Sequence, residues 1–128
     1  MITLTAEGIA YSLKNQRRPI MIPGKITGKR RIIFVLSKER RAAMDGLIVQ
    51  FKNQWAGRPP LVVQLAMELD LYYPNRLHDG SDEIVKDSLQ AAGVLKNDRQ
   101  LYKVTYQKFI DPQRPRVVVR LQEMEAPR

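Results

Sequence analysis

The feature that most constrains the fold is an alternation of apolar residues between positions 61 and 73. The apolar residues of one face occupy every second position: Leu61, Val63, Leu65, Met67, Leu69 and Leu71. The positions between them include Gln64, Glu68 and Asp70. Successive side chains of a β-strand point to opposite faces, so this pattern predicts a strand with one face buried and the other exposed. The chain therefore has to form a sheet with one face covered by other elements of the fold.

Two helices are predicted beside this strand. The first begins after Ser37, a residue type that caps helices, and runs to about Trp55. Its apolar residues recur at three- and four-residue spacing and form one stripe: Met44, Leu47, Ile48, Phe51 and Trp55. The second opens at Ser81 or Asp82 and is closed by Gly93, which suits the position after a helix. Both helices have an apolar face to bury against the sheet.

Four further runs have strand character. They are residues 2–10 with an interruption at Gly8, residues 32–35, residues 101–109 and residues 116–124. The predicted fold class is α+β (mixed α/β), with a three- to five-stranded mixed sheet and two main helices. Residues 1–128 form a single domain, and residues 125–128 a frayed tail.

Composition narrows the class of protein. Cysteine is absent, which excludes disulfides and cysteine-based zinc sites and fits a cytoplasmic location. There is one histidine, so a histidine-rich metal site is also excluded. Because no apolar run reaches membrane-spanning length and the first residues lack a basic segment followed by an apolar one, we expect no transmembrane helix and no signal peptide. We also expect no small organic cofactor.

The net charge of +9 is distributed unevenly. Residues 1–58 hold 12 Lys and Arg against three acids, whereas residues 59–128 hold ten of each. Seven cations and no acid occur between positions 14 and 31: Lys14, Arg17, Arg18, Lys25, Lys29, Arg30 and Arg31. Prolines and glycines in this basic arm (residues 14–31) predict a loop or a loose hairpin. An acid-free basic arm beside a balanced body indicates a polyanion partner such as nucleic acid, or else a solubilising surface.

The segment from His78 to Lys86 has the best pattern for chemistry. Asp79 and Asp82 are three residues apart, and Lys86 lies one helical turn after Asp82. Asp98 follows the helix. We expect the three acids and the lysine to meet at one end of the helix, where carboxylates suit a hard divalent cation. The alternative is structural, because Asp-Gly-Ser-Asp also makes a good turn and helix cap.

Several segments, in order, resemble one family. Residues 12–18 resemble the early Pro-Ser-x-Asn-type loop of the RusA-type Holliday-junction resolvases, which are small endonucleases of phages and prophages. Residues 79–86 resemble their Asp-x-Asp-Asn-x-x-Lys motif. Residues 87–94 resemble Asp-Ala-Leu-x-x-Ala-Gly, and residues 97–100 resemble the Asp-Asp-x-Gln that follows. The resemblance covers nearly the whole chain.

The resemblance implies a homodimer that nicks branched DNA, above all four-way junctions, and depends on Mg²⁺, with Mn²⁺ as a substitute. It makes Asp79, Asp82 and Asp98 metal ligands and Lys86 the catalytic lysine. The proposed DNA-binding residues are the basic arm and its neighbours: Lys14, Asn15, Arg17, Arg18, Lys25, Lys29, Arg30, Arg31 and Arg76. The encoding genome would be that of a phage or its bacterial host.

Two alternatives remain open. The family has one residue between its first two aspartates, and this chain has two, Gly80 and Ser81. Counting back from Asp98 without a gap instead places Asp79 at the second aspartate and Glu83 at the lysine. The second alternative concerns function: a non-catalytic nucleic-acid-binding protein of the same fold with a degenerate metal site, or else a nuclease directed at RNA.

Overall fold

The computed structural model describes residues 1–12, 17–23 and 30–125. In chain order the elements are β1 (Ile2–Glu7), β2 (Arg17–Pro23), β3 (Arg30–Leu36), α1 (Lys38–Trp55), β4 (Leu65–Tyr73), α2 (Glu83–Ala91), the short 3-10 helix η1 (Asp98–Gln100), β5 (Leu101–Ile110) and β6 (Arg116–Glu123). The predicted α+β class, with a mixed sheet and two main helices, is confirmed.

Four strands form the main sheet in the order β1-β6-β4-β5. β6 pairs antiparallel with both β1 and β4, whereas β4 and β5 are parallel. A parallel pair needs a crossover connection, and α2 is that crossover. The connection brings the loop after β4 and the C-terminal half of β5 to the same end of the sheet.

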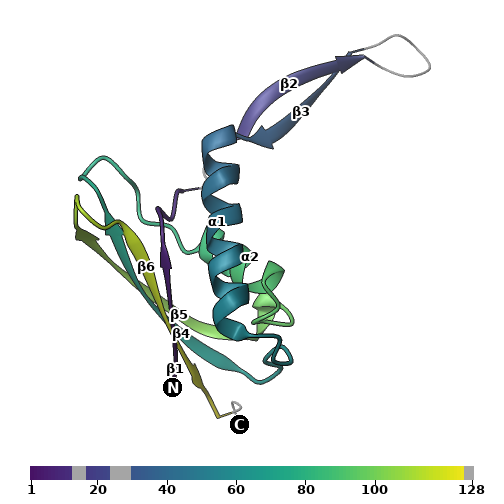
Figure 1. The fold of residues 1–128 in the computed structure, drawn as a ribbon. Coiled ribbons are helices and arrows are strands. Elements are labelled where there is room, and N and C mark those ends of the chain that lie inside the picture. Colours follow the sequence, from purple (N-terminus) through teal and green to yellow (C-terminus); the bar gives the residue numbers. More distant parts are fainter. Residues whose placement is uncertain (13–16, 24–29, 126–128) are drawn as a thin grey trace.

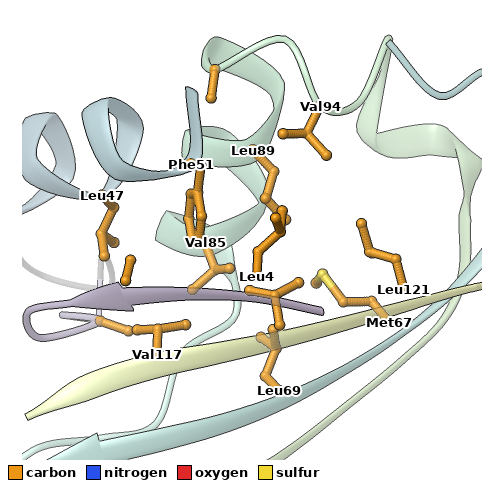
Figure 2. Packing of buried hydrophobic residues seen from close by; sticks show 14 of the residues in the cluster. Leu4, Leu47, Phe51, Met67, Leu69, Val85, Leu89, Val94, Val117 and Leu121 are labelled. Carbon is orange, nitrogen blue, oxygen red and sulfur yellow. The ribbon is translucent and has the colours of Figure 1, made fainter. Parts of the chain in front are cut away.

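Both helices lie on one side of this sheet (Figure 1). Inward-facing residues of three strands are in cross-strand register there, as in the row Leu4, Val119 and Leu69. Figure 2 shows Leu47 and Phe51 of α1 and Val85 and Leu89 of α2 pointing toward these strands. The predicted stripe of α1 is confirmed: Leu47, Phe51 and Trp55 are buried, and Met44 and Ile48 pack against the core.

Strands β2 and β3 form a separate two-stranded antiparallel sheet, in register from Arg17 opposite Leu36 to Pro23 opposite Arg30. Figure 1 shows this hairpin projecting beyond the N-terminal end of α1, away from the main sheet. Of the two predictions for the basic arm, a loop or a hairpin, the structure has the hairpin in the parts that it describes.

The two edges of the main sheet differ. The backbone of β1 is bonded by two glutamines one turn apart on α1. The Gln50 amide accepts from the Glu7 N–H (2.7 Å) and donates to the Glu7 carbonyl (2.8 Å). Gln54 makes the same pair of bonds with Thr5. No strand of the described part of the chain pairs with the outer edge of β5.

Several predicted boundaries were wrong. The strand predicted from Leu61 begins only at Leu65, because the Gln100 side chain bonds the carbonyls of Leu61 and Val63. The first strand ends at the predicted interruption, because Gly8 adopts a φ of 132° that breaks the strand, and it does not continue to Ala10. Ser37 and Gly93 have their predicted roles at helix ends. Of the predicted tail, residues 125–128, the structure describes only position 125, and residues 126–128 lie outside the described residues.

Candidate functional site

Tyr73, the last residue of β4, holds the loop between β4 and α2 in place through hydrogen bonds. Its side chain is fully buried, and its hydroxyl donates to the carbonyl of Ala10 at 2.6 Å. The same hydroxyl lies 3.3 Å from the carbonyl of Asp79. Burial raises the pKa of Tyr73 to about 12. The phenol therefore stays neutral at physiological pH and fixes the backbone at Asp79.

Asp82 is the N-cap residue of α2, but its side chain makes no capping hydrogen bond. Ser81 partly takes that role, because its hydroxyl accepts from the Glu83 N–H at 3.3 Å. The Asp82 carboxylate instead pairs with the ammonium group of Lys86 at 3.2 Å. Both side chains are about a quarter exposed, at 26% each. The predicted closeness of Asp82 and Lys86 is confirmed, and each neutralises the other.

Asp79 precedes this pair on the same loop and is exposed. Negative charge near a helix N-terminus is favoured by the helix dipole, so carboxylates at this end of α2 are in a stabilising position. The structure thus brings Asp79, Asp82 and Lys86 to one end of α2, as expected.

Asp98 does not join them. Its backbone N–H bonds the side chain of Gln90 at 3.3 Å, at the C-terminal end of α2. Eight residues of helix separate Gln90 from Asp82, about 12 Å at 1.5 Å per residue. The expectation that three acids share one end of α2 was wrong, because the chain turns back into β5 only after passing the far end of the helix. Among the described residues, no group of three metal-binding side chains occurs.

Two residues that the sequence did not indicate lie over the loop. A Cβ atom added at Gly80 would be 2.6 Å from Cε2 of Tyr106 and 2.9 Å from Cδ of Lys108. Both side chains come from β5, on the face that the helices cover. Their closeness to Gly80 follows from the parallel pairing of β4 and β5. Lys108 therefore adds a second lysine to this end of α2.

An aromatic cluster packs beside the loop. The ring of His78 stacks on Tyr73 at a centroid distance of 5.3 Å and meets the edge of Tyr11 at 5.6 Å. The guanidinium group of Arg40 lies over Tyr11 at 5.0 Å. His78 is thus held by ring packing beside Asp79, in keeping with a loop contact more than with a metal ligand.

The opposite face of the sheet carries the acids of β4. Asp70 is bound by Arg120 at 2.7 Å, so its carboxylate is already neutralised. Hydrogen bonding to Asp70 raises the pKa of Arg120 further. Glu68 and Asp70 thus lie on the face away from the helices.

The predicted DNA-binding residues are distributed over three places. Arg17 and Arg18 are in β2, and Arg30 and Arg31 in β3. Arg76 is exposed in the turn after β4. The other four lie outside the described residues: Lys14, Asn15, Lys25 and Lys29.

Comparison of the sequence with protein-family models found no match, and comparison with curated proteins found none either. Among the helices of the described residues, none is long and apolar enough to cross a membrane.

Proposed function

We propose that this protein is a divalent-metal-dependent, structure-specific endonuclease of the RusA type that cleaves branched DNA, with four-way junctions as the leading substrate. We infer that it acts as a homodimer in the cytoplasm of a bacterium, encoded by the host or by a phage. A two-fold dimer suits a four-way junction because two equivalent sites then face two equivalent strands.

One observation supports the proposal above the others. Asp79, Asp82 and Lys86 lie together at the N-terminal end of α2, within a chain whose four motif segments follow the order of the resolvases. The hairpin of β2 and β3, called the basic hairpin below, offers a separate surface for phosphates. An acidic site and a separate basic surface match the two tasks of an endonuclease, which are cutting and holding.

The metal would be Mg²⁺, or Mn²⁺ in its place, held by Asp79 and Asp82. Mg²⁺ is usually held by one or two carboxylates together with substrate phosphates, so these two residues fit without Asp98. When bound, the ion would polarise the phosphodiester and supply a nucleophilic water. Lys86 and Lys108 would orient the phosphate and offset the negative charge that develops on it.

A second candidate is a non-catalytic protein that binds branched nucleic acid. It is favoured by the ion pair of Asp82 with Lys86 and by the position of Asp98, since the described chain has no three-acid set. In that case the loop would be a capped helix start and the basic hairpin would carry the function.

A labelled synthetic four-way junction, incubated with Mg²⁺ or with EDTA, separates these candidates. We expect paired nicks in Mg²⁺ and none in EDTA. Asp82→Asn should abolish cleavage and keep or improve junction binding, because one negative charge fewer faces the phosphates. The matched control is Asp45→Asn, an exposed aspartate on α1, which should cleave as the wild type does. Wild-type cleavage by Asp82→Asn would exclude this site, and junction binding without cleavage would favour the second candidate.

A further inference from the structure

The outer edge of β5 is the open edge of the main sheet. Apart from its bonds to β4, the backbone of residues 103–109 makes no hydrogen bond to another backbone group of the described chain. By contrast, the opposite edge of the sheet is closed by Gln50 and Gln54. Three of the seven exposed large apolar side chains among the described residues belong to this strand: Tyr102, Tyr106 and Ile110. An open edge strand pairs readily with another chain, so proteins normally protect such edges.

We propose that β5 pairs antiparallel with β5 of a second copy of this chain, about a two-fold axis at Tyr106, and so joins the two main sheets into one. The register of β5 shifts at its start, between Leu101 and Lys103, and is regular from Lys103 to Ile110. Tyr106 is the middle residue of the run 103–109, so an axis there pairs that whole run with its own copy. The inference rests on the proposed homodimer and names the surface that builds it.

On the face that the helices cover, the proposed register brings apolar and aromatic groups together. Val104, Tyr106 and Lys108 lie on this face, beside core residues of β4. Across the axis, Tyr106 would lie opposite Tyr106 of the second copy, and Val104 opposite the aliphatic stem of Lys108. Aromatic pairs directly across two strands are stabilising, and like charges directly opposite one another are destabilising. The register provides the first and avoids the second.

On the other face, the same register would extend a stack of side chains. The rings of Tyr72 and Phe109 lie 4.8 Å apart at an interplanar angle of 18°, and the Arg116 guanidinium lies 3.6 Å from the Tyr72 ring. These groups come from β6, β4 and β5 in turn, and adjacent strands are about 4.8 Å apart. Lys103 of the second copy would lie opposite Phe109, one strand further. Its ammonium group could bind the outer side of the Phe109 ring, because cations are attracted to aromatic faces.

The pairing would also fix how the two candidate sites are arranged. The two-fold axis of an antiparallel strand pair is perpendicular to the sheet, so the helices of both copies would lie on one face. Tyr106, at the axis, is close to the loop before α2, since a Cβ atom added at Gly80 would be 2.6 Å from its ring. The two loops that carry Asp79 and Asp82 would therefore flank the axis on the same face. Two equivalent strands of a junction could then be cut from one side of the dimer.

Single cysteines test the position of the axis, because the chain has none of its own. Tyr106→Cys in the full chain should form a covalent dimer in oxidised glutathione. Directly opposed strand residues have Cα atoms roughly 4.5–5.5 Å apart, which a disulfide can bridge. Thr105→Cys is the matched control, since its own copy would be two residues out of register, roughly 7–8 Å away and beyond disulfide reach. Non-reducing gels measure the covalent dimer, and urea midpoints establish that both variants are folded.

A charge test does not depend on cysteine chemistry. In the proposed register Thr105 lies opposite Gln107 of the second copy, twice in each dimer. Thr105→Lys with Gln107→Lys opposes like charges and should raise the dissociation constant of the dimer by roughly two- to thirtyfold in sedimentation equilibrium. Thr105→Lys with Gln107→Glu opposes unlike charges and should dimerise at least as tightly as the wild type. Both positions lie beside acids of β4, Glu68 and Asp70, so a single copy should accommodate the two lysines.

Three results would overturn the inference. The first is a wild-type chain that sediments as a monomer at micromolar concentration. The second is a Thr105→Cys crosslink as efficient as that of Tyr106→Cys. The third is a dimer that neither cysteine crosslinks and that both charge variants leave unchanged, which would place the contact elsewhere. Paired nicking of a junction by such a dimer would remove the β5 interface and leave the proposed function. A dimer crosslinked at position 106 that does not cleave in Mg²⁺ would do the reverse.

Discussion

At the scale of single residues, Tyr73 couples the core to the proposed site. It stacks on His78, bonds Ala10 and lies against the backbone of Asp79. Removing its hydroxyl leaves a buried carbonyl unpaired, at a cost of about 1–3 kcal/mol. Tyr73→Phe should therefore lower the free energy of unfolding at pH 8 by that order, as measured by urea titration.

The raised pKa of Tyr73 also predicts a dependence on alkaline pH. The unfolded chain loses this proton near pH 10, and the folded chain holds it to about 12. Above pH 10 the unfolded state therefore binds fewer protons, and stability falls between pH 10 and 12. Tyr73→Phe lacks this contribution, so the stability gap between the two proteins should narrow across that range. A gap that stays constant from pH 8 to 12 would contradict the assignment.

Lys86 and Glu83 distinguish the two alignments of the acidic segment. If Lys86 acts on the phosphate, Lys86→Ala should lower junction cleavage strongly. Unfolding stability should change by only about 0.5 kcal/mol, since helix pairs four residues apart contribute little. Glu83 is exposed, and Glu83→Ala should have a much smaller effect on cleavage. If Glu83→Ala is the more damaging change, the ungapped alignment is the correct one.

At the scale of elements, the pair Gln50 and Gln54 closes the β1 edge. Each glutamine bonds both backbone groups of one β1 residue. The double variant Gln50→Ala with Gln54→Ala should lower the free energy of unfolding by roughly 1–3 kcal/mol, because water at an exposed edge replaces part of the lost hydrogen bonds. The bare edge should also raise light scattering on concentration. Asn53→Ala, on the same helix and exposed, is the control, and equal behaviour of the two proteins would refute this role.

The elements that could be predicted well from the sequence are those whose buried side chains recur at regular spacing along the chain. The stripe of α1 and the alternation within β4 each have one buried face, so composition and spacing agree. β5 has no fully buried side chain, and no periodic pattern indicates how it pairs. Its parallel pairing with β4 depends on a crossover through α2, and pairing partners distant in sequence have no local signal.

The same limit applies to the candidate site. Asp82 and Lys86 are one helical turn apart, so their contact could be predicted from spacing. Asp98, Tyr106 and Lys108 depend on the path of the chain after α2. That path takes Asp98 to the far end of the helix and returns Tyr106 and Lys108 to the loop. Knowledge that β5 runs parallel to β4 would have predicted both outcomes.

At the scale of the whole molecule, the excess positive charge is concentrated in one part of the structure. The acid-free basic arm includes β2 and the start of β3, which form their own sheet, and the main sheet with its helices holds the balanced remainder. Such a division lets one part hold phosphate backbones while the other presents the acidic loop. Contacts to phosphate position a protein on DNA without reading its sequence, so the hairpin should act on duplex and junction alike.

Replacing Lys29, Arg30 and Arg31 by Ala tests this division. Each lost duplex phosphate contact should lower the slope of log affinity against log salt by about 0.9, so three contacts would lower it by about 2.7. Junction and duplex affinities should fall by a similar factor. Thermal stability should barely change, because the hairpin pairs with itself and not with the main sheet. The control removes three cations of α1, Lys38, Arg41 and Lys52, and should keep the wild-type slope. An unchanged slope in the hairpin variant, together with a large fall in melting temperature, would make the basic arm a structural element and remove the charge argument for nucleic acid.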